Sequence, residues 1–197
     1  NHLMQELVIM TGALEMMIVD YQCIMPSVTH VSKCFHTKVV STSDKAKFPG
    51  ATHVSFDPKR GMEIGHELVR TAVENYANRV PQRVRIPDQP VDLMGGFSVE
   101  AIVGALGGTP KPLVEAIAKG QIRGAVGVVG CNNPKIRQDY GHVTLTRRLI
   151  ENDILVVVTG CAAVANGKAG HMKPESADLA GPGLSAVCKA LGIPPVL

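Results

Sequence analysis

Two cysteines occur in the same local context, each directly after a glycine that follows a short apolar run. The segments are GAVGVVGCNN, which contains Cys131, and ILVVVTGCAA, which contains Cys161. The two cysteines lie 30 residues apart (161 − 131), which is about the length of one strand–helix–strand unit. Because the carboxyl ends of parallel strands meet at one edge of a sheet, this spacing predicts that both thiols lie at the same edge.

A third cysteine has a related position. Cys23 comes three residues after Asp20, the expected end of the buried strand MMIVD. Thiolates are soft ligands that suit zinc and iron–sulfur clusters. Three thiols that follow three strands therefore predict a soft-metal site formed by Cys23, Cys131 and Cys161.

The neighbours of these cysteines support a metal site. The glycine before Cys131 and the glycine before Cys161 are expected to let the backbone approach a bulky group. Each of these cysteines is expected to precede a helix N-terminus, where N–H groups and the helix dipole favour a thiolate. Asn132 and Asn133 are predicted to donate hydrogen bonds to cluster sulfides.

Some of these residue patterns also allow other interpretations. Cys34 and Cys188 are expected to lie buried at apolar helical positions, because a single cysteine is more often a core residue than a ligand. His30 and Cys34 stand at i and i+4, as in half of a zinc site, but the sequence has no second pair with ligand spacing. TGCAAVANGKAG resembles a phosphate-binding loop, yet Ala162 and Ala169 replace the residues that such a loop needs.

Composition and charge limit the class of protein. The 197 residues contain five cysteines and no secretory signal, which favours metal binding or burial over disulfides. A net charge of +3 is too small to indicate nucleic acid as the main partner, and the basic segment Arg79–Arg85 is expected to be a solvated linker. The acidic residues among the first twenty argue against a membrane span or signal peptide, so a cytoplasmic protein is expected.

The pattern of apolar residues predicts an α/β fold of parallel sheets with flanking helices on both faces. In the first half, helices are expected at 2–14, 26–34 and 60–79, and strands at 16–20, 38–42 and 53–56. The helix at 60–79 is the clearest, with Ile64, Leu68, Ala72 and Val73 on one face. In the second half, helices are expected at 98–106, 111–120 and 142–152 and after Cys161 and Gly183, with strands at 125–129 and 154–158. Residues 80–96, rich in Pro and Gly, are predicted to link the two α/β units.

Five segments carry a resemblance to a known family. VDYQCIMPS, CFHTKVVSTSDKAKFPGATHVSFD, VGVVGCNNPK, ILVVVTGCAA and AGPGLSAVCKALGIPPVL resemble the anaerobic nickel–iron carbon monoxide dehydrogenases, and the match runs along the whole chain. The resemblance implies a homodimer whose subunit has a helical N-terminal domain and two Rossmann-like domains. Residues 1–79 then match the end of the first Rossmann-like (middle) domain, 80–96 the linker, and 97–197 the first part of the second.

The resemblance also implies an activity. The family oxidises CO with water to CO2 at a nickel–iron–sulfur cluster of the Ni-4Fe-4S type. Electrons leave through further 4Fe-4S clusters to a ferredoxin-type acceptor, and the residues of those clusters have no match in this chain. By the same resemblance, Cys23, Cys131 and Cys161 bind the three irons of the cubane part of the active cluster.

The remaining parts of the family's site have no counterpart here. The ligands of the outlying iron, the nickel thiolate and the catalytic acid–base residues are all unmatched. The sequence lacks an initiator Met and stops at GIPPVL, where a further strand is expected. We therefore expect a piece of a longer enzyme that is inactive alone. The alternatives are the related hybrid-cluster proteins, which carry out reductive nitrogen chemistry, and a non-catalytic, metal-free α/β fragment.

Overall fold

The computed structural model describes residues 4–197 of the chain. The chain divides into two compact units, Asn1–Gln89 and Pro90–Leu197. The division falls inside the expected linker, and residues 84–98 contain no helix or strand. No helix in the described part of the chain is long and apolar enough to cross a membrane.

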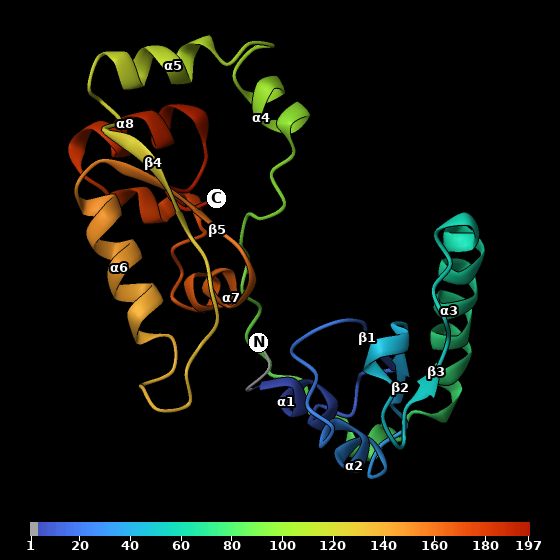
Figure 1. Cartoon of the computed structure of the whole chain (residues 1–197). Helices are drawn as coiled ribbons and strands as arrows, with labels where there is room; N and C mark the ends of the chain where they lie inside the picture. Colours follow the sequence, from blue (N-terminus) through green and yellow to red (C-terminus); the bar gives the residue numbers. More distant parts are fainter. Residues whose placement is uncertain (1–3) are drawn as a thin grey trace. The chain divides into compact units, whose positions relative to one another are not determined.

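The first unit is built on a parallel sheet of three short strands (Figure 1). The order is β1 (Met16–Val19), β2 (Lys38–Ser41) and β3 (Thr52–His53), with β2 in the centre. In the register, Val19 pairs with Ser41, and Ser41 pairs with His53. The carboxyl ends of all three strands therefore lie at the same edge, as the sequence predicts.

Three helices accompany this sheet: α1 (Gln5–Met10), α2 (Val28–Ser32) and α3 (Gly61–Asn75). The core joins Ile9 of α1 and Val28 of α2 to Val19 and Val39 of the sheet. The helix expected over 2–14 is shorter, and its residues 2 and 3 lie outside the described part. It ends at Met10 because Gly12 has a φ of +66°, which no continuing helix allows.

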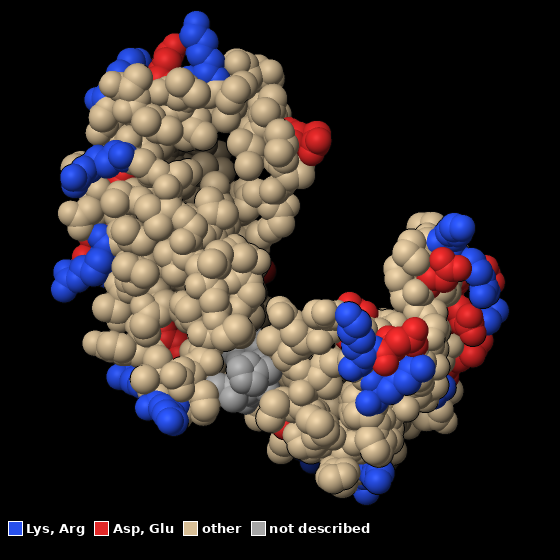
Figure 2. Space-filling view, viewed as in Figure 1, with Lys and Arg blue, Asp and Glu red and all other residues tan. Residues whose placement is uncertain are grey.

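Helix α3 differs from its prediction in length and in its faces. It ends at Asn75, whose buried side chain donates to the carbonyl oxygens of Glu15 (2.8 Å) and His36 (2.7 Å). Ile64 is buried as expected, but Val73 is 68% exposed, so the predicted apolar face is only partly covered. Figure 2 shows acidic and basic side chains interspersed over α3, with no continuous basic area on this face.

The expectation that Arg79–Arg85 is a solvated linker is partly wrong. Arg79 is half-buried: it pairs with Glu15, donates to the carbonyl oxygen of Ala13 at 2.7 Å and lies over the ring of Tyr76. Burial alone would raise the pKa of Glu15, but the hydrogen bonds from Arg79 and His36 lower it overall. The arginine therefore anchors the end of α3 to the start of β1.

The second unit has a two-stranded parallel sheet, β4 (Gly124–Val128) and β5 (Ile154–Val158). A single parallel bridge joins Val156 to Val196 near the C-terminus. The helices are α4 (Val99–Ala105), α5 (Lys111–Ala118), α6 (Tyr140–Glu151), α7 (Gly160–Lys168) and α8 (Pro182–Leu191). The larger core combines Ile150 of α6 and Leu184 of α8 with Val156 of β5 and with Ile122 and Val196, which lie outside the helices.

The prediction that strands are covered on both faces is wrong for β4. β5 buries Leu155, Val156 and Val158, whereas Val126 of β4 is 37% exposed. β4 pairs only with β5 among the described strands, and its glycines and alanine offer little side chain to pack. The mixed α/β class with parallel sheets and flanking helices is nevertheless confirmed.

Candidate metal centre

Cys131 and Cys161 occupy matching positions after adjacent parallel strands. In the register of β4 and β5, Val128 pairs with Val158. Cys131 and Cys161 therefore lie the same number of residues beyond the paired strand ends. The structure places both cysteines at the carboxyl edge of one sheet, as the sequence predicts.

The glycine before each cysteine is required by backbone conformation. Gly130 has a φ of +124° and Gly160 a φ of +60°, values that residues with a side chain rarely adopt. A Cβ added at Gly160 would meet nothing within 4 Å, and one at Gly130 would meet only His142, at 3.9 Å. Within this unit, the glycines therefore serve to turn the chain at each strand end rather than to make room for a neighbour.

Cys161 is a buried residue in the first turn of a helix. It is the second residue of α7 and is 6% exposed. The N–H groups of a first turn have no partners within the helix and favour negatively charged ligands. A helix N-terminus lies at this cysteine, as predicted, but α7 begins one residue before Cys161 rather than after it.

Cys131 lies instead in a loop. The cysteine is exposed, and α6 begins only at Tyr140, so the prediction of a helix directly after it is wrong. Nε2 of His142 contacts the carbonyl oxygen of Cys131 at 3.2 Å. A hollow of about 440 Å³ opens beside the cysteine, and its walls include Val129, Ile136 and Leu145.

The side-chain amides of Asn132 and Asn133 form hydrogen bonds within the loop that follows Cys131. Asn132 is 7% exposed. Its Nδ2 donates to Oδ1 of Asp139 at 2.9 Å, and its Oδ1 accepts the backbone N–H of Asp139 at 2.7 Å. The side-chain oxygen of Asn133 accepts the backbone N–H of Lys135 at 2.9 Å. The side chain of Asn132 thus joins the two ends of the loop, and that of Asn133 closes a local turn. The amide nitrogen of Asn132 uses one of its two N–H donors for Asp139, so donation by these asparagines to cluster sulfides remains a prediction.

Cys23 follows β1 in the first unit and has an unusual backbone. Its φ is +57°, which is uncommon for a residue other than glycine. The side-chain amide of Gln5 donates to its carbonyl oxygen. Backbone outliers of this kind persist where surrounding contacts hold them, and they concentrate at functional sites. Because Cys23 belongs to a different unit from Cys131 and Cys161, the convergence of all three remains a prediction.

The described part of the chain contains no preformed cluster of potential metal ligands. Among residues 4–197, no group of three or more His, Cys, Asp or Glu side chains is arranged to hold a metal ion. Each unit by itself supplies thiols at a strand edge: one from the first unit and two from the second. The donor set of the second unit, two sulfurs on adjacent strands, fits a soft metal or an iron–sulfur cluster rather than a hard cation.

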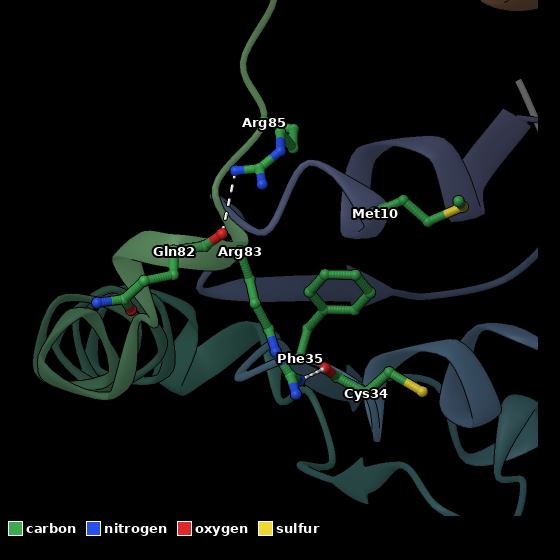
Figure 3. Close-up of a pocket in the computed structure, with 6 residues that line it drawn as sticks. All are labelled: Met10, Cys34, Phe35, Gln82, Arg83 and Arg85. Carbon is green, nitrogen blue, oxygen red and sulfur yellow. Dashed lines mark hydrogen bonds between the residues drawn. The ribbon is translucent and has the colours of Figure 1, made fainter.

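The two cysteines predicted to be core residues have different outcomes. Cys188 in α8 is 1% exposed, and burial raises the pKa of its thiol to about 11. Cys34 is exposed and lies after the end of α2, so its predicted burial is wrong. Figure 3 shows it at the side of a hollow of about 480 Å³, where Arg83 donates to its carbonyl oxygen at 2.6 Å. The helix stops before Cys34, and the thiol is therefore left outside the core.

Two residues near the cysteines were missed by the sequence analysis. Lys168, the last residue of α7, forms an ion pair with Asp139, the residue before α6. Burial alone would raise the pKa of Asp139, but the hydrogen bonds from Lys168 and Asn132 lower it overall. The only sequence signal was an aspartate just before an amphipathic helix, which usually predicts a helix cap.

The comparison with protein families gives one match over residues 1–197, described as the Prismane/CO dehydrogenase family. The chain belongs to this family. Among curated relatives, carbon monoxide dehydrogenase 1 of Methanosarcina mazei is 54% identical over the whole chain, which corresponds to 31% of that relative. The carbon monoxide dehydrogenase of Rhodospirillum rubrum is 44% identical over 98% of the chain. The chain thus spans about 31% of the length of these family members.

Solved structures of family members agree with this assignment. A nickel-free carbon monoxide dehydrogenase from Thermococcus sp. AM4, produced without CooC maturase, matches the whole chain with a TM-score of 0.85 and 55% identity. This chain covers 31% of that structure. An acetyl-CoA synthase/carbon monoxide dehydrogenase matches with a TM-score of 0.83 and 37% identity over 99% of the chain and 31% of its own. That structure is described as containing NiZn[Fe4S4] and NiNi[Fe4S4] clusters in its alpha subunits.

Proposed function

We propose that Cys23, Cys131 and Cys161 each bind one iron of a Ni-4Fe-4S cluster in a carbon monoxide dehydrogenase. The matched positions of Cys131 and Cys161 beyond the paired ends of β4 and β5 carry this proposal. Cys23 supports it, because it also follows a parallel strand and has a constrained backbone. Membership of the Prismane/CO dehydrogenase family and relatives named carbon monoxide dehydrogenase favour the same chemistry.

The proposed overall reaction is CO + H2O → CO2 + 2 H+ + 2 e−. When bound, the cluster supplies a metal that binds CO, a metal-activated water and a store for two electrons. The three cysteines of this chain anchor that cluster and act neither as acid, base nor nucleophile. The turns at Gly130 and Gly160 present two of these thiols at the sheet edge.

Membership of the family supports a proposal for the wider setting. We infer that the full-length protein is a cytoplasmic homodimer whose small-molecule substrates and product are CO, water and CO2. Its electrons pass through further 4Fe-4S clusters to a ferredoxin-type acceptor. Residues 1–79 form the end of a first Rossmann-like domain, 80–96 a linker, and 97–197 the beginning of a second. The parallel sheet of each unit supports this division.

The proposal is tested by serine substitutions in the full-length enzyme. Cys23→Ser, Cys131→Ser and Cys161→Ser should each lower cluster iron and CO-dependent viologen reduction, because a hydroxyl is a poor ligand for iron in a sulfide cluster. Cys34→Ser and Cys188→Ser are matched controls that should keep both. Cys188→Ser should cost stability, about 1–3 kcal/mol for a buried hydroxyl, whereas the exposed Cys34 should tolerate serine. Full iron content and activity in Cys131→Ser would contradict the assignment.

The isolated chain should not oxidise CO. It offers three thiols for cluster irons, but it has no residue that matches the nickel thiolate or the ligands of the outlying iron. Positioning of the reactants and stabilisation of charge are then lost together. A viologen assay on the chain, reconstituted without oxygen with nickel, iron and sulfide, measures this. Turnover comparable to that of the full-length enzyme would show that this chain contains a complete active site, and would contradict the prediction.

A further inference from the structure

The loop that follows Cys131 is closed by a reciprocal pair of hydrogen bonds. The side-chain oxygen of Asn132 accepts the backbone N–H of Asp139 at 2.7 Å, and its nitrogen donates to Oδ1 of Asp139 at 2.9 Å. Asn132 directly follows Cys131, and Asp139 directly precedes α6. These bonds therefore hold the two ends of the loop together.

The second carboxylate oxygen of Asp139 contacts a different element. It accepts from Nζ of Lys168, the last residue of α7, whose first turn contains Cys161. The side chain of Asp139 is only 13% exposed. Partial burial of the carboxylate makes its attraction to the ammonium stronger than that of a pair in open water. The Cys131 loop is thus tied to the helix that carries Cys161.

Two features of Asp139 indicate that its carboxylate serves this contact. Asp139 occupies the N-cap position of α6, where an aspartate usually accepts N–H groups of the first turn, but its side chain makes no such bond. Its φ is +66°, which is uncommon for a residue with a side chain. The local fold therefore accepts an unfavourable backbone conformation and leaves the helix uncapped while the carboxylate binds Asn132 and Lys168.

We propose that Asp139 is a positioning residue for the thiol of Cys131. Through Asn132 it fixes the loop next to the cysteine, and through Lys168 it fixes that loop relative to α7. The thiols of Cys131 and Cys161 are then held at a fixed separation before metal binds. Residues that contact metal ligands without binding the metal orient those ligands in the same way at other metal sites. This inference rests on the proposed function, because it takes both cysteines as metal ligands.

The test uses Asp139→Asn in the full-length enzyme, purified without oxygen. Asparagine accepts a positive φ and keeps an oxygen for Asn132, but it removes the charge that binds Lys168. Iron should be lost to a chelator on the order of 10-fold faster than from the wild type. The electron paramagnetic resonance spectrum of the cluster should change as well.

A second variant approaches the same contact from the helix. Lys168→Met should release iron as fast as Asp139→Asn, and the double variant should be no faster than either single variant because both remove one interaction. Lys168→Arg keeps the positive charge and should restore slow release. The matched control is Asp178→Asn, which breaks an ion pair with Lys189 (2.7 Å) elsewhere in the same unit. The control should leave iron release and the spectrum unchanged.

The outcomes separate this inference from the proposed function. Wild-type iron release and spectrum in both Asp139→Asn and Lys168→Met would overturn the positioning role, as would an equal effect of Asp178→Asn. Cys131→Ser serves as the reference in the same assay. If Cys131→Ser loses iron while the Asp139 and Lys168 variants do not, only the positioning role is wrong. If Cys131→Ser keeps all its iron, the proposed function itself is wrong.

Discussion

At the scale of single residues, the second unit holds a buried histidine that no proposed chemistry uses. His171 is 3% exposed, and its Nδ1 lies 2.8 Å from the side-chain oxygen of Asn166. Because that oxygen can only accept, Nδ1 carries the proton in this contact. Asn166 in turn donates to the carbonyl oxygen of Ala162 in α7 at 2.9 Å. The histidine thus joins the end of α7 to the segment that follows it.

The burial of His171 predicts that the protein loses stability in mild acid. Burial, and then the nearby Arg147, lower the pKa of His171 below its ordinary value of 6.5. The unfolded chain therefore takes up a proton at a higher pH than the folded chain does. Below about pH 6.5 the free energy of unfolding should fall, by at most about 1.4 kcal/mol per pH unit, until the folded histidine also protonates.

The measurement is urea unfolding between pH 7 and pH 5, for the wild type and for His171→Asn. The asparagine keeps a donor near Nδ1 but cannot take up a proton, so its curve should be flatter over this range. Thr144→Ala, an exposed uncharged change on α6, is the control and should keep the wild-type slope. Identical slopes for the wild type and His171→Asn would show that His171 is not the titrating group.

At the scale of elements, close backbone contacts at helix starts decide how the second unit packs. The N-terminus of α8 is held by Asp153, whose Oδ1 accepts the backbone N–H of Leu184 at 2.8 Å. Gly183, the second residue of α8, lies against the chain at Gln121: a Cβ there would be 2.1 Å from the carbonyl oxygen of Gln121. The helix can approach this turn only because residue 183 has no side chain.

Replacement of this glycine should therefore be costly. Gly183→Ala should lower the free energy of unfolding by roughly 1–3 kcal/mol or more, because backbone atoms must move apart. The matched control is Gly141, the second residue of α6, where a Cβ would meet nothing within 4 Å. Gly141→Ala should raise stability by about 0.4–1 kcal/mol, since alanine restricts the unfolded chain. Denaturant unfolding of both variants checks the pair, and equal effects would contradict the packing argument.

The sequence predicted these elements well where their pattern is local. The strand at 154–158 and the neighbouring helices follow from apolar runs and their flanking residues, and the structure has them within a few positions. Cys34 was misplaced because α2 ends at Ser32, and nothing in the local pattern marks that end. The contact of Asp139 with Lys168 was missed because it joins residues far apart in sequence. Local patterns predict where chains turn, but not which side chains then meet.

At the scale of the whole molecule, the chain is two separately packed units with an irregular connection. The backbone N–H of Arg85 bonds to Thr11 at 2.8 Å in the first unit, and that of Met94 bonds to Met172 at 2.8 Å in the second. Between them lie three exposed apolar residues: Ile86, Val91 and Leu93. Exposed segments without helix or strand are preferred sites of proteolysis.

Limited digestion should therefore cut the chain between the units first. Thermolysin, which cleaves before apolar residues, should act at Ile86, Val91 or Leu93 and leave two products that resist further cleavage. Electrophoresis and mass spectrometry of a digestion time course identify the first cut. Serine at all three positions is the control and should slow it. A first cut within β4, β5 or α6 would contradict two stable units.

The strands of each sheet are close together along the chain, and this has a consequence for the order of synthesis. β1–β3 lie within Met16–His53, and β4–β5 within Gly124–Val158, so the first sheet can pair on the ribosome before the second has been made. Cys161 follows Cys23 by 138 residues (161 − 23), which takes roughly 7–28 s at about 5–20 residues per second. During that interval the exposed thiol of Cys23 is without its proposed co-ligands. On the proposed assignment, a cluster that uses all three thiols can be inserted only after Cys161 has been made.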